Sequence, residues 1–307
     1  MIKIALEYND NKIVEFPVSI IKFADGQTSS CIHLVDRIVK ENKIKGIVVY
    51  CYIRSNDEFI SLLQVFNVLD ELNLSYNVVM PYLFGARSDR RFCADRSFDL
   101  EVYLNMIFKG SKSLSLKKGI FQVFDPHNIE NKLYYNFGFV CKISAIPFIN
   151  KVIDSYNKKI CVVFPDKGAF ERYKDVLKNK NVGEIIVAEK KRDEEGKIFS
   201  FKIDYSGNEL QYKTVLVIDD ICDGGSTFLC VANALQRFSI ECLDLYVSHG
   251  VFSRGIDMIA DKYTTINCSN SYSDIYHPQV KQFDITKSFF SHTCEWFFNI
   301  YFVKNKH

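Results

Sequence analysis

The chain has 307 residues, which is enough for one large or two medium-sized domains. Its 39 Lys and Arg residues against 37 Asp and Glu leave a net charge of +2, which argues against a protein that binds nucleic acid with its whole surface. Apolar residues make up 48% and aromatic residues 14% of the chain, so a packed core is expected and global disorder is excluded. No apolar run reaches the roughly 18–20 residues that a membrane-spanning helix requires.

The N-terminal segment and the cysteines both indicate a cytoplasmic protein. Glu7 follows the first apolar residues, where a signal peptide would continue its apolar core. None of the 10 cysteines forms a Cys-x-x-Cys pair, and several lie in apolar runs, as Cys161 does before Val162. We therefore expect reduced, mostly buried thiols and no disulfide framework.

The first half of the chain contains a strand–helix–strand unit. Residues 46–53 form an apolar run with many β-branched side chains, which is typical of a buried strand. Ser55 and Glu58 then have the spacing of a capping box, and apolar residues at helical spacing predict a helix over 59–69. Residues 76–80 predict a second strand. Parallel sheets are built from such units.

The second half repeats this pattern, and together the halves predict an α/β fold. Four apolar runs predict strands at 159–164, 184–188, 213–218 and 243–248, and a helix is expected over 226–238. We expect two domains, 1–146 and 147–307, each with a mostly parallel sheet flanked by helices. The aromatic tail from 289 to 303 is expected to pack on the first domain or on a partner subunit.

The most informative segment runs from 215 to 227. Four apolar residues predict a buried strand, and Asp219 and Asp220 follow at its carboxyl end, where ligands bind in open α/β sheets. Gly224 and Gly225 then lead into a helix with two hydroxyl side chains in its first turn. Glycines let backbone N–H groups approach a phosphate closely, and the helix N-terminus adds partial positive charge. The aspartates suit sugar hydroxyls or a bridging metal; the simpler alternative is a solvated acidic turn.

This segment resembles the ribose-phosphate loop of the phosphoribosyltransferase superfamily. Within that superfamily, almost the whole chain is similar to the ribose-phosphate pyrophosphokinase family, also called phosphoribosyl pyrophosphate synthetase. Six further segments resemble that family's motifs, in the family's order. They are FADGQ at 23–27, PYLFGARSDRR at 81–91, DPH at 125–127, FPDKGA at 164–169, EKKR at 189–192 and SHGVFS at 248–253.

The resemblance implies a reaction and a cofactor. Enzymes of this family transfer the β,γ-pyrophosphoryl group of ATP to the 1-hydroxyl of ribose 5-phosphate, which gives phosphoribosyl pyrophosphate and AMP. The resemblance makes Lys190 and Arg192 the expected catalytic residues, which would stabilise the transferred group. It also implies Mg²⁺ as cofactor, with His127 and Asp166 as ligands and with waters and substrate phosphates completing the site.

The resemblance also assigns the two substrates to separate sets of residues. ATP is expected at Phe23, Asp25, Gln27, Arg87, Ser88 and Asp89. The ribose phosphate is expected at Asp219, Asp220, Asp223, Gly224, Gly225, Ser226 and Thr227. In the family, the aromatic residue matching Phe23 stacks on adenine from a neighbouring subunit, so we expect a homo-oligomer, a dimer or a hexamer. No nucleic-acid or membrane partner is expected.

Several departures from the family pattern leave the acceptor open. Gln27 replaces a glutamate, Ser88 replaces a glutamine, and DGGST at 223–227 replaces DTGGT. One alternative is therefore transfer to a larger ribose 5-phosphate derivative such as ADP-ribose, as in relatives that serve NAD salvage. A non-catalytic regulatory homologue and a base-transferring phosphoribosyltransferase are further alternatives. The segments around Arg87 and Lys190 argue against the base-transferring enzyme. Retention of Lys190, Arg192, His127 and Asp166 argues against the regulatory homologue.

Overall fold

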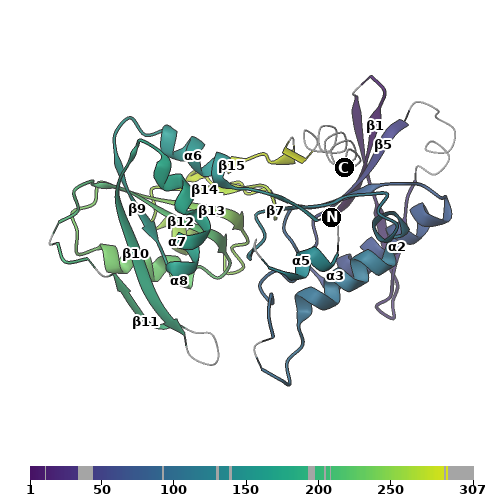
Figure 1. The fold of residues 1–307 in the computed structure, drawn as a ribbon, viewed down its shortest axis with the longest axis horizontal. Coiled ribbons are helices and arrows are strands. Elements are labelled where there is room, and N and C mark those ends of the chain that lie inside the picture. The colour runs from purple at the N-terminus through teal and green to yellow at the C-terminus, as the bar shows by residue number, and fades with distance from the viewer. Residues whose placement is uncertain are drawn as a thin grey trace, which may run out of the picture. The chain divides into compact units, whose positions relative to one another are not determined.

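Figure 1 shows the computed structural model of the chain, which divides into two compact units. One unit comprises Met1–Ile143 and Lys287–His307, and the other comprises Ser144–Thr286. The domain bounds drawn from the sequence, 1–146 and 147–307, stay a prediction. For 191–192 and 198–200 the structure describes the backbone alone. The residues that it describes are 1–10, 12–33, 44–91, 93–128, 131–137, 140–192, 198–203, 205–207, 209–286 and 288–289.

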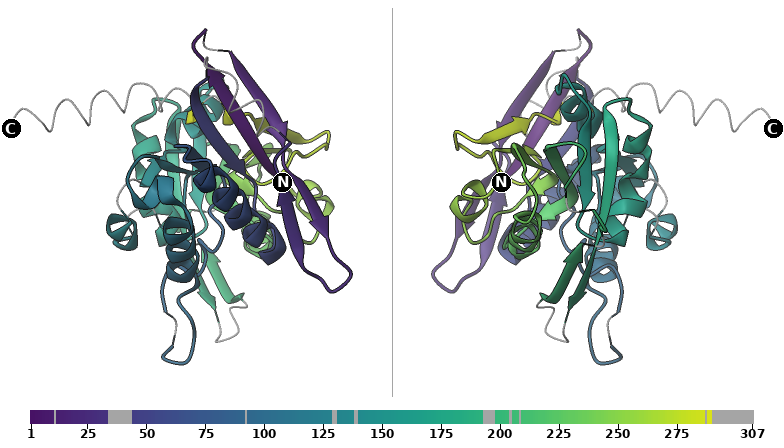
Figure 2. Two further views of the ribbon diagram at one scale, coloured as in Figure 1. Left: turned by 90° about the vertical axis from the view of Figure 1, so that its right-hand side faces the viewer. Right: turned by 90° about the vertical axis from the view of Figure 1, so that its left-hand side faces the viewer.

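The first unit is built on a six-stranded sheet. Its strands, in sheet order, are β2 (Ile13–Pro17), β1 (Ile2–Tyr8), β5 (Ile44–Cys51), β6 (Asn77–Met80), β7 (Phe121–Phe124) and β8 (Val140–Ile143). β5 to β8 are parallel neighbours, whereas β1 runs antiparallel to β2 and β5. A hairpin of β3 (Ser19–Lys22) and β4 (Thr28–Cys31) continues from β2 and projects as a purple ribbon in Figure 2. The helices are α2 (Asn56–Glu71), α3 (Asp99–Gly110), α4 (Lys112–Ser115) and α5 (Leu133–Asn136).

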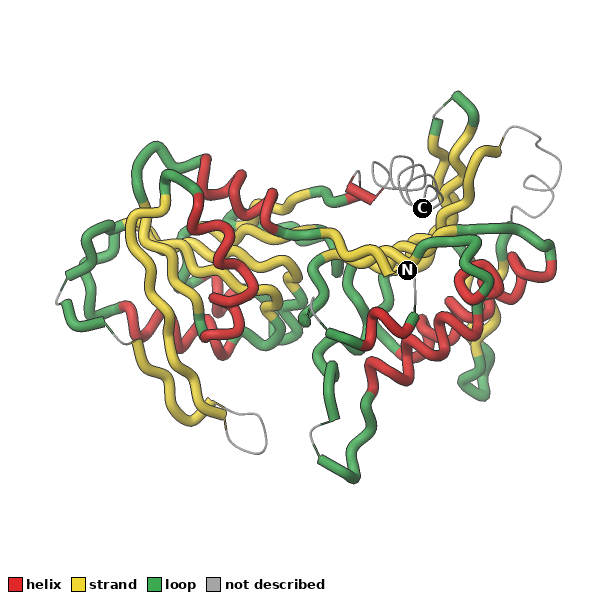
Figure 3. The backbone as a smooth tube through the Cα atoms, in the orientation of Figure 1, coloured by secondary structure: helices red, strands yellow, loops and turns green. Residues whose placement is uncertain are grey.

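The second unit contains a seven-stranded sheet. Its strands, in sheet order, are β11 (Ile198–Ile203), β10 (Val182–Arg192), β9 (Ile160–Phe164), β12 (Thr214–Cys222), β13 (Cys242–Gly250), β14 (Thr265–Ser269) and β15 (Val280–Phe283). Every neighbouring pair is parallel except β10 and β11, which form the long antiparallel pair visible in Figure 3. The helical elements are α6 (Ile146–Asp154), α7 (Lys167–Tyr173), the 3-10 helix η1 (Lys174–Lys178), α8 (Ser226–Leu235) and α9 (Asp257–Ala260).

The predicted α/β class, with mostly parallel sheets flanked by helices, is confirmed. All five residues of β9 are buried, and so are Thr214 to Ile218 at the start of β12. A strand that is covered on both faces appears in the sequence as a continuous apolar run, which is why these strands could be predicted. Among the described residues, no helix combines the length and apolar character that crossing a bilayer demands.

Helix α2 begins with a modified form of the predicted capping box. Ser55 has extended backbone angles, and its hydroxyl accepts a hydrogen bond from the Glu58 backbone N–H at 3.2 Å. The Glu58 carboxylate accepts from the Arg54 backbone N–H at 2.6 Å, one residue before the position that the pattern predicts. Below this cap, Phe59, Leu62 and other apolar side chains of α2 pack into the core of the first unit, which orients the helix.

We expect Ser55→Ala to lower the free energy of unfolding by about 1 kcal/mol, because the substitution leaves the Glu58 backbone N–H without its side-chain acceptor. Urea denaturation of the full chain measures this change. The control is Ser115→Ala, since that hydroxyl only bonds the Lys112 carbonyl at 3.3 Å at the end of a helix. Equal effects of the two substitutions would contradict a capping role for Ser55.

Candidate active site

The pairing of β9 with β12 brings three carboxylates to one edge of the second sheet. Val163 of β9 lies opposite Val217 of β12 in the parallel register. Asp166 and Asp220 each follow three residues later, and Asp219 precedes Asp220. Because the carboxyl ends of parallel strands meet at one edge, these side chains face a common region. Asp220 is only 5% exposed, so this region lies partly below the protein surface.

Lys190 joins this group from β10, on the other side of β9. Phe164 pairs with Val187, and Lys190 follows three residues later. Lys190 forms an ion pair with Asp166, and both side chains are mostly covered, at 16% and 27% exposure. Asp166 also caps helix α7 by accepting a hydrogen bond from the Ala169 backbone N–H at 2.8 Å. Two predicted site residues that lie 24 positions apart in the sequence are therefore in direct contact.

The environment shifts the pKa values of the clustered carboxyl groups in opposite directions. Burial would raise the pKa of Asp166, but the charge and hydrogen bond of Lys190 and the Ala169 N–H bring this pKa below its ordinary value of 3.8. The pKa of Asp219 is raised well above 3.8 because burial and the neighbouring Asp220 carboxylate both oppose its ionisation. Asp219 Oδ1 accepts from the Asp220 backbone N–H at 2.9 Å. Opposed shifts within one group of side chains are typical of functional sites.

The loop after β12 has the backbone features that the sequence predicts for a phosphate-binding turn. Gly225 adopts φ +78°, is buried, and stands as the residue before helix α8. A Cβ at this position would lie 2.6 Å from Ile259 Cδ1, so both its backbone angles and its surroundings require glycine. The first turn of α8, with Ser226 and Thr227, contains no acidic residue. Its backbone N–H groups and dipole therefore remain suited to an anion.

In the first unit, the structure joins two of the predicted ligand segments. β6 and β7 are parallel neighbours, so the loops that follow them lie at the same sheet edge. The Asp89 carboxylate accepts from the side-chain amide of Asn128 at 3.0 Å, and the Asp89 carbonyl accepts from Asn131 at 2.8 Å. These bonds place the segment that includes Arg87 and Ser88 beside the loop of His127, whose side chain is exposed.

The third predicted segment of the first unit forms the tip of the β3–β4 hairpin. The Phe23 backbone N–H donates to the Gln27 carbonyl at 2.8 Å, and the Gln27 N–H donates to Asp25 Oδ1 at 3.0 Å. Gly26 completes the turn with φ +89°. The Phe23 side chain is 52% exposed, so its ring is accessible to a ligand or to another subunit.

The position of the Arg192 side chain and the approach of the two predicted metal ligands to each other stay predictions. The backbone of Arg192 belongs to β10, but its side chain lies outside the described residues. His127 belongs to the first unit and Asp166 to the second, so their joint ligation of a metal stays a prediction. The described residues include no cluster of three or more His, Cys, Asp or Glu that could form a metal site alone. The oxygen donors nevertheless suit Mg²⁺, which characteristically takes further ligands from water and substrate phosphates.

Sequence analysis did not assign a role to Arg254, which lies near the predicted phosphate loop at 223–227. Arg254 Nε lies 3.3 Å from where a Cβ on Gly224 would be. Arg254 comes directly after the SHGVFS segment at 248–253. A basic residue at the end of this motif is the sequence feature that could have identified it. Its position beside the loop depends on the pairing of β12 with β13, which no local pattern reveals.

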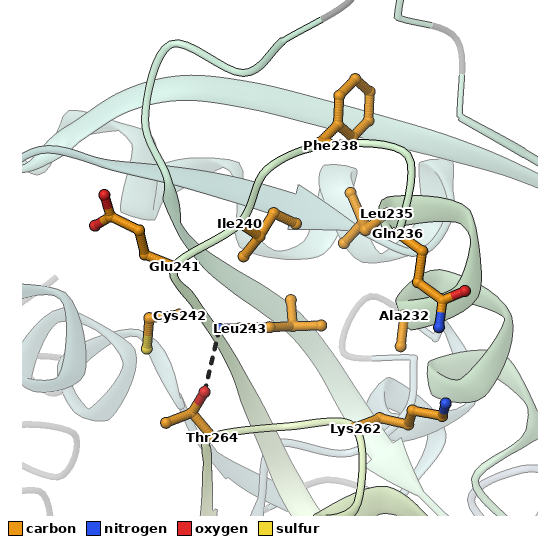
Figure 4. A pocket seen from close by; sticks show the side chains of 10 residues that line it. All are labelled: Ala232, Leu235, Gln236, Phe238, Ile240, Glu241, Cys242, Leu243, Lys262 and Thr264. Atoms are coloured by element: carbon orange, nitrogen blue, oxygen red, sulfur yellow. Dashed lines mark hydrogen bonds between the residues drawn. The ribbon is translucent and has the colours of Figure 1, made fainter.

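A cavity of about 280 Å³ lies elsewhere in the second unit (Figure 4). It opens beside the start of β13, where the Leu243 backbone N–H donates to Thr264 Oγ1 at 3.4 Å. The charged cluster lies at the carboxyl ends of the strands, so the cavity and the candidate active site are separate. The residues that line it are Ala232, Leu235, Gln236, Phe238, Ile240, Glu241, Cys242, Leu243, Lys262 and Thr264.

Known proteins share both the fold and the sequence pattern. The family described as "Phosphoribosyl transferase domain" matches residues 143–281. A ribose-phosphate pyrophosphokinase of Sulfurisphaera tokodaii is 26% identical over 252 residues, which are 80% of this chain and 82% of that protein. One of Pyrococcus abyssi is 27% identical over 241 residues, or 78% of each chain. The crystal structure of phosphoribosylpyrophosphate synthetase from Mycobacterium smegmatis superposes with a TM-score of 0.74 at 16% identity, covering 92% of this chain and 91% of that one.

The fold and the match over 143–281 give the second part of the chain the character of a phosphoribosyl transferase domain. Most of the chain is similar in sequence to ribose-phosphate pyrophosphokinases, and this similarity supports an enzyme, a transferase.

We expect Asp219→Asn to stabilise the fold as the pH rises. The raised pKa of Asp219 means that its ionisation opposes folding, an effect that is absent below pH 3.8 and complete above the folded-state pKa. The asparagine keeps the acceptor for the Asp220 N–H but carries no charge. Urea denaturation should show a higher free energy of unfolding for Asp219→Asn than for the parent chain at pH 8. The gain should disappear towards pH 4.

The matched control is Asp261→Asn, because Asp261 is exposed in the same unit. This control should show no comparable gain between pH 4 and pH 8. If Asp219→Asn were less stable than the parent chain at pH 8, the unfavourable burial of the Asp219 charge would be refuted.

Proposed function

We propose that this enzyme transfers the β,γ-pyrophosphoryl group of ATP to the 1-hydroxyl of ribose 5-phosphate, giving phosphoribosyl pyrophosphate and AMP. The observation that carries the proposal is the contact of Lys190 with Asp166 beside the Asp219–Asp220 pair, next to a turn suited to phosphate. The names of the relatives support the same reaction. A base-transferring enzyme would use the turn but would leave Lys190 without a role.

The residues of the second unit divide the task between sugar and phosphate. Asp219 and Asp220 accept hydrogen bonds from the ribose hydroxyls, and the turn at 223–227 binds the 5-phosphate through its N–H groups and hydroxyls. Lys190 stabilises the negative charge of the transferred group, and Arg192 adds a planar fork of donors from the same strand. Because Asp166 is the counter-ion of Lys190, substrate phosphates compete with Asp166 for this charge.

Residues of the first unit are proposed to hold ATP. The segment of Arg87, Ser88 and Asp89 is positioned by the Asn128 and Asn131 amides, and Arg87 supplies positive charge for the polyphosphate. At the hairpin tip, Asp25 and Gln27 order the turn that presents Phe23. We propose that Phe23 stacks on adenine bound to a neighbouring subunit, which makes the enzyme a homo-oligomer, a dimer or a hexamer.

Mg²⁺ is proposed as the cofactor, with Asp166 and His127 as its protein ligands. The donor chemistry fits, because a carboxylate and an imidazole leave room for the waters and phosphate oxygens that Mg²⁺ favours. When bound, the ion neutralises charge on the ATP phosphates. Independently of the ion, Asp166 holds Lys190 at the strand edge and caps α7.

The cysteines support a cytoplasmic location for the enzyme. Every cysteine in the described part of the chain is free. Burial raises the pKa of the Cys222 thiol, which lies at the end of β12 directly before the phosphate loop. Such a thiol is a poor nucleophile, so Cys222 acts as a small buried side chain. Unpaired thiols of this kind are typical of reducing compartments.

A larger acceptor is the second candidate substrate, because Arg254 lies beside the phosphate turn. Arg254 could bind either a terminal 5-phosphate or the diphosphate of a larger ribose derivative such as ADP-ribose, the substrate expected in NAD salvage. A non-catalytic regulatory homologue is the remaining alternative. It is disfavoured because Lys190, Asp166 and Asp219 form one connected charged cluster.

Incubation with Mg-ATP and each acceptor in turn should separate these alternatives. We expect AMP release with ribose 5-phosphate and the appearance of phosphoribosyl pyrophosphate, measured by chromatography. AMP release with ADP-ribose alone would identify the larger acceptor as the substrate. Absence of AMP with every acceptor, despite ATP binding, would support the regulatory homologue and refute the proposed reaction.

Lys190→Ala should lower turnover by about 100-fold or more, because the lysine acts mainly on charge that develops in the transition state. The KM for ATP should change little. Steady-state AMP release measures both constants, and circular dichroism checks the fold. Lys178→Ala is the control, since the Lys178 side chain is 81% exposed and, among the described residues, forms an ion pair with Asp175 alone. Normal turnover with a raised KM would show that Lys190 serves ground-state binding instead.

A further inference from the structure

We propose that Arg254 is a specificity-determining residue that binds the 5-phosphate of the acceptor from the Gly224 side of the loop. This inference rests on the proposed function, because it assigns a phosphate to that loop. A Cβ built on Gly224 would lie 3.3 Å from Nε, 3.4 Å from Cδ and 3.6 Å from Cζ of Arg254. The end of the arginine side chain therefore lies against the loop backbone, where it can reach a phosphate held by that backbone.

The segment that carries Arg254 is tied to the start of the phosphate loop. The backbone N–H groups of Val251 and Phe252 both donate to the Cys222 carbonyl, at 2.9 and 3.0 Å. Cys222 directly precedes Asp223, the first residue of the loop. The turn closes with a hydrogen bond from the Gly255 N–H to the Phe252 carbonyl at 2.9 Å. Arg254 therefore keeps its place relative to the loop through backbone bonds.

The charge of Arg254 is available to a ligand. Its side chain is exposed, and within the described part of the chain neither an ion pair nor a hydrogen bond engages it. The loop at 223–227 contains no basic residue, begins with Asp223 and directly follows the strand that carries Asp219 and Asp220. A nearby cation would add to the backbone N–H groups that face a phosphate at this turn, and the guanidinium fork matches phosphate oxygens in geometry as well as in charge.

The expected effect is on acceptor binding and not on the chemical step. Arg254→Ala should weaken the binding of ribose 5-phosphate by about 10- to 100-fold, as expected for the loss of a charge-assisted hydrogen bond. Turnover at saturating acceptor should change less than threefold, because the 5-phosphate is remote from the reacting 1-hydroxyl. Arg254→Lys should recover part of the affinity, since it keeps the charge but lacks the fork.

Isothermal titration of the full-length protein with ribose 5-phosphate tests the inference, and ADP-ribose is the second probe. Arg237→Ala is the matched control, because Arg237 follows the opposite end of α8 and donates to the Ile203 and Tyr205 carbonyls at 3.4 and 3.3 Å. This control should bind each acceptor as the parent chain does. Unphosphorylated ribose should bind equally poorly to the parent chain and to Arg254→Ala.

The result that supports the inference is weaker binding of each acceptor that the parent chain binds, with partial recovery in Arg254→Lys. Unchanged binding of ribose 5-phosphate by Arg254→Ala would overturn it, and so would a loss confined to ADP-ribose, which would assign the arginine to a second phosphate. Failure of the proposed reaction is distinguishable, because AMP release by the parent chain tests the reaction, whereas the titration reports on the phosphate site without ATP.

Discussion

The parallel register of β9 with β10 and β12 is the constraint on which the candidate active site depends. It aligns Asp166, Lys190 and Asp220 at one sheet edge, although they come from three separate segments. A shift of one residue in any pairing would turn the affected side chains to the opposite face of the sheet.

The same packing makes ionisation of the buried carboxyl groups at the site unfavourable. Burying Asp219 beside Asp220 raises the pKa of Asp219, whereas Lys190 offsets the cost for Asp166 and lowers the pKa of that residue. The net charge of +2 over the whole chain therefore conceals strong local opposites. Natural proteins accept such unfavourable burial at functional sites, where the charge serves binding and not stability.

Backbone conformation contributes as much to the candidate site as side-chain chemistry does. Gly225 supplies positive φ where α8 begins, and Ile259 leaves no space for a side chain there. Beside it, the two bonds to the Cys222 carbonyl link the loop to the turn that carries Arg254. In the first unit, amides of Asn128 and Asn131 hold the Asp89 segment in a similar way. Both candidate loops are thus held by hydrogen bonds to segments that follow a neighbouring strand.

Local patterns in the sequence determined the α/β class, the buried strands, the helix start at Ser55 and the residue types of the phosphate loop. These features depend on neighbouring residues alone: apolar runs for covered strands, capping spacing for a helix start, and glycine where backbone must approach a ligand. Only the tertiary structure decided that Lys190 pairs with Asp166, and that Arg254 lies beside Gly224. Such contacts join segments that are distant in sequence, so they follow from strand order and register, which no local pattern encodes.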